Sequence, residues 1–91
     1  MKPIPPSESL IEYPSDFPIK VMGPTHTEFA PTIVLVVQKH DQDFHEGKME
    51  VRPSAKGNYT GLTCVVRAIS REQLDALYSE LSAHPMVKIV M

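Results

Sequence analysis

Apolar and polar residues alternate in four segments of this chain, and each predicts a β-strand. In residues 16–22, Phe17, Ile19 and Val21 share one parity, while Lys20 and Met22 share the other. Successive side chains of a strand point to opposite faces, so such a segment can bury one side and expose the other. The predicted strands comprise residues 16–22, 48–53, 59–69 and 86–91.

A helical repeat is clearest in residues 70–84. Ser70 and Gln73 have the spacing of a capping box at its start, and Pro85 stops it. The apolar stripe expected to face the core consists of Leu74, Leu77, Tyr78 and Leu81.

Residues 25–40 predict a second helix, with a strand as the competing interpretation. Thr25 and Glu28 have capping-box spacing, and apolar residues recur at helical intervals as far as the polar QKHDQD. Pro31 disfavours helical geometry at Ala30, and the IVLVV run is rich in β-branched residues. We favour a helix whose regular part begins at Pro31, a position compatible with a first turn.

The predicted order is strand, helix, strand, strand, helix, strand. Right-handed crossovers then give an α+β ferredoxin-like (βαββαβ) sandwich: a four-stranded antiparallel sheet of order 4-1-3-2 with both helices on one face. Pro53 cannot donate a ladder hydrogen bond, which suits the second strand at an edge. We expect one domain over residues 15–91, preceded by a flexible proline-rich arm over residues 1–14.

Composition limits the classes of function. The net charge is −2, so no overall basic field favours nucleic acid or anionic membranes. The single cysteine, Cys64, lies in an apolar run and predicts a buried thiol in a reducing compartment. We find no membrane span or secretory signal pattern and expect a cytoplasmic protein.

The stretch RPSAKGNYTG joins the second and third predicted strands. Gly57 and Asn58 tolerate positive φ, and Ser54 can bond nearby backbone, so a hairpin turn is the simplest interpretation. The alternative is an anion site in which backbone amides near Gly57 act together with Lys56. The stretch lacks the phosphate-loop pattern GxxxxGK[ST]. The candidate ligand-binding residues here are Ser54, Lys56, Gly57 and Asn58.

The segments VMG, VVQKH, VRPSAKGNY and VKIVM resemble the YbeD-like family of small bacterial proteins of unknown function, over residues 13–91. That resemblance implies a ferredoxin-like fold similar to the ACT regulatory domain, and binding of a small ligand or a partner enzyme. ACT domains bind amino acids near the turn after the first strand. Gly23 occupies the analogous place, although VMGPTHTE departs from the ACT pattern, which has an acidic residue and a proline before the glycine.

Alternation also predicts a basic patch on the sheet face that no helix covers, with one cation from each strand. Such a patch could receive an acidic partner protein, a small anionic ligand or RNA. The simpler alternative is a solvent-exposed face without a binding role, in which charged side chains pair across neighbouring strands. The four cations are Lys20, Arg52, Arg67 and Lys88.

Apolar side chains lie among these cations, and partial burial in a homo-oligomer, most simply a dimer, would cover them. They are Met22, Val65 and Val90 by the same alternation. RNA-binding domains of this topology stack bases on aromatic residues of the middle strands. Here those positions hold Thr63, Val65, Lys20 and Met22, so we do not expect nucleic acid binding.

No residue pattern predicts catalysis, a cofactor or a metal site. The polar loop HDQDFHEG contains His40, Asp41 and His45, but its spacing matches no standard metal site. Ser54 has no fixed histidine partner in view. The leading hypothesis is a non-catalytic regulatory or small-ligand-binding module. The alternatives are a protein-interaction adaptor that uses the basic face and, third, an RNA-binding protein.

Overall fold

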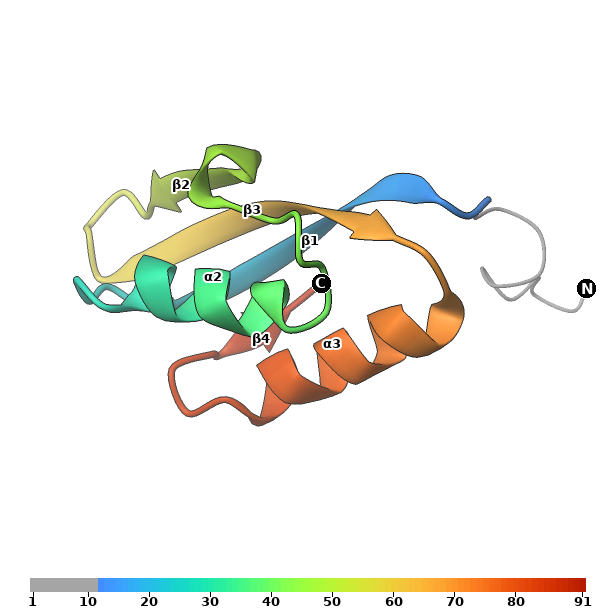
Figure 1. Ribbon diagram of the computed structural model, residues 1–91. Coiled ribbons are helices and arrows are strands. Elements are labelled where there is room, and N and C mark those ends of the chain that lie inside the picture. The colour runs from blue at the N-terminus through green and yellow to red at the C-terminus, as the bar shows by residue number, and fades with distance from the viewer. Residues whose placement is uncertain (1–11) are drawn as a thin grey trace, which may run out of the picture.

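The computed structural model describes residues 12–91, so most of the predicted arm lies outside it. It has two layers, a sheet and a pair of helices (Figure 1). Neither helix is long and apolar enough to span a bilayer, so the described residues contain no membrane-spanning helix. In chain order the elements are β1 (Ser15–Pro24), α2 (Phe29–Gln38), the 3₁₀ turn η1 (Glu46–Lys48), β2 (Met49–Pro53), β3 (Tyr59–Ala68), α3 (Arg71–Ala83) and β4 (Ile89–Val90).

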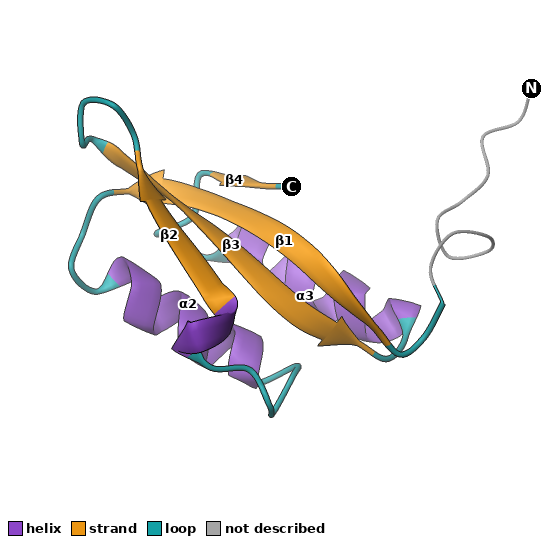
Figure 2. Ribbon diagram, turned by 90° about the horizontal axis from the view of Figure 1, so that it is seen from above, coloured by secondary structure: helices purple, strands orange, loops and turns teal. Residues whose placement is uncertain are grey.

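The strand order is β2-β3-β1-β4, and all neighbours are antiparallel. This is the predicted order 4-1-3-2 written in reverse, and both helices lie behind one face of the sheet (Figure 2). The ferredoxin-like α+β fold is therefore confirmed, with Pro53 on an edge strand as predicted. The central pair, β1 and β3, is matched along its whole length from Ser15↔Ala68 to Pro24↔Tyr59.

The core lies between the central strands and the helices. Ile19 and Val21 alternate with exposed residues along β1, as predicted, and Cys64 of β3 is fully buried. Burial raises the pKa of the Cys64 thiol to about 11. The other fully or almost fully buried apolar side chains are Phe29, Ile33, Val37, Phe44, Leu62, Val66, Ala68, Leu77 and Leu81.

The segment 33–37 is helical, which decides between the two interpretations of α2. The helix begins at Phe29 rather than Pro31, and Pro31 sits in its first turn, where no intrahelical amide bond is lost. The predicted capping box of Thr25 and Glu28 is wrong. The Thr25 hydroxyl is hydrogen-bonded to that of Thr60 on β3 at 2.8 Å, and the Glu28 amide donates to Nδ1 of His26 at 2.9 Å.

The start of α3 follows the prediction more closely. Ser70 is the N-cap, and its hydroxyl accepts the amide of Gln73 at 3.0 Å. The Gln73 side chain accepts from the amide of Ile69, not from that of Ser70 as in a standard capping box. Its Nε2 also donates to the carbonyls of His40 and Arg67, so Gln73 joins three parts of the chain.

Candidate functional site

The sheet face opposite the two helices, the open face, has a hollow of about 510 Å³. Gly61 of β3 is among its lining residues. The register places Arg52 of β2 on one side of Gly61 and Met22 of β1 on the other. Tyr59 and Thr63 share the same face along β3, because they lie two residues away on either side. Gly61 therefore leaves a gap among longer side chains.

The hollow combines an apolar wall with a polar rim. Exposed apolar side chains come from β1, β3 and the end of the chain, and Ser54 and Thr63 add hydroxyl groups. A mixture of this kind, in a volume of a few hundred Å³, is typical of small-molecule sites. The lining residues are Lys20, Val21, Met22, Glu50, Arg52, Pro53, Ser54, Tyr59, Gly61, Leu62, Thr63, Ile89 and Met91.

The two cations of the hollow differ in their partners. The Arg52 guanidinium lies 3.0 Å from the Glu50 carboxylate, and both side chains are largely exposed. Lys20 forms no salt bridge with any residue in the range 12–91. Among the described residues, the hollow therefore contains one ion pair, between Arg52 and Glu50, and one lysine without a salt bridge.

The predicted four-cation face is only partly assembled. Lys20 and Arg52 line the hollow, whereas Arg67 pairs in register with Asp16 near the other end of β3. Lys88 is exposed but precedes β4 and does not line the hollow. Lys20, Arg52 and Arg67 keep the open-face positions that alternation predicts, and the prediction of one cation from each strand fails at Lys88.

The cause of the error at Lys88 is the register of β4. Val90 pairs with Val21 and packs against the core, while Ile89 pairs with Met22 and is 49% exposed. The prediction that Val90 faces the open side is wrong, and alternation no longer assigns Lys88 to that side. Ile89 and Met91 take the open-face positions instead.

The stretch 54–58 forms the hairpin turn between β2 and β3, as its simplest interpretation predicted. Gly57 has φ of 75°, and its amide donates to the carbonyl of Ser54 at 3.0 Å. The Ser54 hydroxyl accepts the amide of Tyr59, and the Asn58 carbonyl accepts that of Thr25. Ser54 also lines the hollow, whereas Lys56, Gly57 and Asn58 do not.

Gly23, which the ACT resemblance places beside a ligand-binding turn, lies inside β1, paired with Thr60, and is buried. A Cβ at this position would meet the carbonyl oxygen of Met86 and would lie 2.8 Å from the Phe29 ring. Gly23 therefore allows close packing of the 84–87 segment on β1 and offers no room for a ligand.

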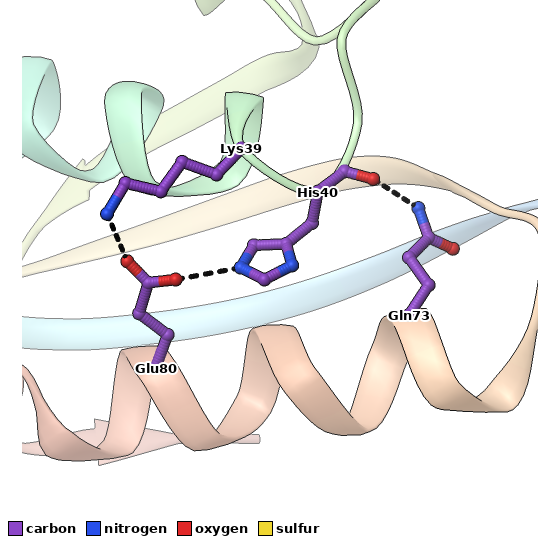
Figure 3. Close-up of polar contacts among 4 residues, drawn as sticks. All are labelled: Lys39, His40, Gln73 and Glu80. Atoms are coloured by element: carbon purple, nitrogen blue, oxygen red, sulfur yellow. Dashed lines mark hydrogen bonds and ion pairs between the residues drawn. The ribbon is translucent and has the colours of Figure 1, made fainter.

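A second polar cluster lies on the helical side, remote from the hollow (Figure 3). Glu80 of α3 accepts hydrogen bonds from Lys39 at 2.7 Å and pairs with Nε2 of His40 at 2.8 Å. The hydrogen bonds from Lys39 and His40 hold the pKa of the Glu80 carboxyl below its ordinary value. With Gln73, this cluster ties the segment after α2 to α3.

Asp41 and His45 of the 40–46 loop also accept hydrogen bonds from backbone amides. Asp41 is buried, and its carboxylate accepts the amides of Asp43 and Arg67. Nδ1 of His45 accepts the amide of Gly47. Within residues 12–91 no group of three histidine, cysteine, aspartate or glutamate side chains could hold a metal ion.

Sequence reasoning identified Lys20, Arg52 and Ser54 but missed the residue at the centre of the hollow. A glycine inside a strand pattern signals a bulge or a close approach of another group, and Gly61 stands inside YTGLTCVV. The sequence therefore contained a local signal for the special position of Gly61. No comparable signal identified Ile89 and Met91, because MVKIVM carries apolar residues at both its odd-numbered and its even-numbered positions.

Comparisons with known proteins place the chain in a bacterial family. The family model described as "Protein of unknown function (DUF493)" matches residues 8–91. A UPF0250 protein of Ralstonia nicotianae is 69% identical over 96% of this chain and 90% of that protein. A UPF0250 protein of Janthinobacterium is 65% identical over the full length of both.

Two solved structures have the same fold. Protein HP0495 from H. pylori covers 100% of this chain and 98% of its own, with a TM-score of 0.73 and 12% identity. The ACT domain from GTP pyrophosphokinase of Chlorobium tepidum covers 84% of each chain, with a TM-score of 0.61 and 19% identity. The YbeD-like, ACT-like resemblance is thereby confirmed, and the chain belongs to the DUF493 family of small uncharacterised bacterial proteins.

Proposed function

We propose that this protein is a non-catalytic regulatory module that binds a small molecule in the hollow around Gly61. The observation that carries the proposal is the hollow itself, about 510 Å³ in volume, with an apolar wall and a lysine that forms no salt bridge within residues 12–91. Pockets that bury small ligands have this size and this mixture of surfaces. The ACT-like fold supports a regulatory role, because the resemblance to that family implies ligand binding.

The side chains around the hollow favour binding over catalysis. Within residues 12–91 it is lined by no histidine or cysteine, and Ser54 already accepts the amide of Tyr59. Glu50 is paired with Arg52 and exposed, so it lacks the buried surroundings that tune a general acid or base. These features support a receptor site.

Blocking the hollow tests the proposal. A Cβ on Gly61 would meet only the Arg52 carbonyl oxygen, at 3.6 Å, which is ordinary contact, so we expect Gly61→Val to fold and to place its methyl groups in the hollow. Val65→Leu is the matched control, because it adds apolar bulk on the same strand and face but outside the lining. We expect wild type and Val65→Leu to retain from bacterial lysate, under native mass spectrometry, a small molecule that Gly61→Val does not retain. Identical spectra for all three proteins would contradict the proposal.

A protein-interaction adaptor is the second candidate, supported by the exposed apolar side chains of the open face. Met22, Val65, Ile89 and Met91 are 37%, 36%, 49% and 63% exposed. Val65 lies outside the hollow, so a protein surface would cover it whereas a small ligand would not. A protein captured from lysate by wild type and by Gly61→Val, but lost with Val65→Glu, would favour the adaptor.

RNA binding has less support. RNA-binding domains of this topology stack two or three bases on aromatic side chains of the sheet. In the described part of the chain, the open face presents one aromatic residue, Tyr59, at the beginning of β3. A single ring does not make a stacking platform.

A further inference from the structure

We infer that the hollow takes an amphipathic anion, a molecule with an apolar body and one acidic group that lies against Lys20. This inference rests on the proposed function and names the chemical class of its ligand. Three features of the open face, as residues 12–91 form it, support the inference: a lysine without a salt bridge, an apolar wall that includes flexible methionines, and a second cation that is already paired.

The isolation of Lys20 follows from the register. Its neighbours across the sheet are Thr63 on β3 and the end of the chain, where Lys20 and Met91 exchange two backbone hydrogen bonds. The nearest acidic side chain in that row is Glu50, beyond Thr63, and it is paired with Arg52. Beside apolar side chains a charge is less well screened than on an open polar surface, so an incoming anion would be attracted more strongly.

Arg67 provides the contrast on the same face. The register puts it directly opposite Asp16, so strand pairing itself supplies an opposite charge. Within residues 12–91, the side chain paired across β3 from Lys20 is Thr63, which carries no charge. Lys20 also lines the hollow whereas Arg67 does not, so Lys20 is the cation that a ligand in the hollow would meet.

The wall beside Lys20 suits an apolar body. Met22, Ile89 and Met91 lie on the β1 and β4 side of the hollow, and Tyr59 is 45% exposed on the β3 side. Unbranched methionine side chains adapt to ligands of different shape. A ligand that covered these groups would remove exposed apolar surface from water.

The hollow offers too few cationic groups to bind a polyphosphate. Arg52 is already engaged by Glu50, and both helix N-termini are behind the opposite face of the sheet (Figure 2). A second copy of the chain fits less well too, because a sheet packed across this face would leave the hollow at Gly61 unfilled. The charge and shape favour a small molecule with a single acidic group.

Two fluorescent probes that differ in one charged group test the inference. The anion 8-anilino-1-naphthalenesulfonate and neutral N-phenyl-1-naphthylamine share an aromatic skeleton. With the full chain, we expect saturable binding of the anion, with a Kd on the order of tenfold below that of the neutral probe. Chemical-shift changes in amide NMR spectra should centre on Met22, Gly61 and Thr63.

Three variants separate the possible outcomes. Lys20→Met should weaken the anion to the level of the neutral probe and leave the neutral probe unchanged. Lys56→Met, at the exposed hairpin tip, should change neither. Gly61→Val should abolish both, while its cooperative urea unfolding and dispersed amide spectrum show that it is folded.

Equal binding of the two probes, or no effect of Lys20→Met, would overturn the anion class; if Gly61→Val still abolishes binding, the hollow stands as a ligand site. Binding of both probes to folded Gly61→Val would overturn the hollow and the ligand class together. A dimer in sedimentation that excludes both probes, and that Val65→Glu dissociates to restore binding, would make a second copy the occupant and overturn the inference.

Discussion

The two faces of the sheet use the same strands for different purposes. Along β1, Ile19 and Val21 are at most 1% exposed, whereas Lys20, which lies between them, and Met22, which follows Val21, face solvent. The covered face packs against two helices, so a change there alters the volume of a dense core. Within residues 12–91 no helix packs on the open face, so its side chains can contact solvent or another molecule. One strand therefore contributes both to the packed core and to the proposed binding surface.

The largest expected effect comes from removing bulk on the covered face. Leu62 of β3 is fully buried, and Leu62→Ala should lower the free energy of unfolding by about 2–5 kcal/mol, because it leaves a cavity. Val65→Ala, on the same strand but 36% exposed, should cost less than about 1 kcal/mol. Urea unfolding of both variants measures the difference. Similar losses would contradict the view that packing is confined to one face.

The two strand glycines sharpen the comparison. Gly23→Ala brings a methyl group against the Met86 carbonyl and the Phe29 ring, and should destabilise the fold by about 1–3 kcal/mol through overpacking. Gly61→Ala meets no close atom, and alanine restricts the unfolded chain more than glycine does. We expect it to be neutral or stabilising by up to about 1 kcal/mol. Thermal unfolding would refute this contrast if Gly61→Ala were the less stable variant.

The smallest expected effect concerns the contact between α3 and the segment after α2. The pKa of Glu80 is lowered from its ordinary value of 4.5 by hydrogen bonds from Lys39 and His40. Its carboxylate therefore contributes stability above pH 4.5, and that contribution is lost as the pH falls through the lower folded-state pKa. Glu80→Gln should cost about 0.5 kcal/mol at pH 7, because the pair is partly exposed.

Urea unfolding at pH 7 and pH 3 checks this prediction. The difference between wild type and Glu80→Gln should shrink at the lower pH. Glu46→Gln is the control, since Glu46 is exposed and forms no salt bridge within residues 12–91. A loss of stability in Glu80→Gln that is the same at both pH values would show that the carboxylate charge plays no part.

Sequence alone determined the elements whose two faces differ in polarity. In β1 and β3 the buried and exposed parities are chemically distinct, and Pro53 marked an edge strand because it lacks an amide hydrogen. In α3, Ser70 and the leucine stripe defined a helix before any contact was known. These features are local, since a residue's type and its neighbours along the chain suffice to specify them.

Only the tertiary structure decided where the candidate site lies. MVKIVM is apolar on both parities, so the orientation of β4 depends on its backbone bonds to Lys20 and Met22, not on its pattern. Thr25 is hydrogen-bonded to Thr60 on β3 instead of capping α2. A glycine is needed at position 23 because the Met86 carbonyl packs closely against it. The hollow around Gly61 likewise exists because three strands bring Arg52, Gly61 and Met22 into one row, and such neighbours are created by pairing between distant segments.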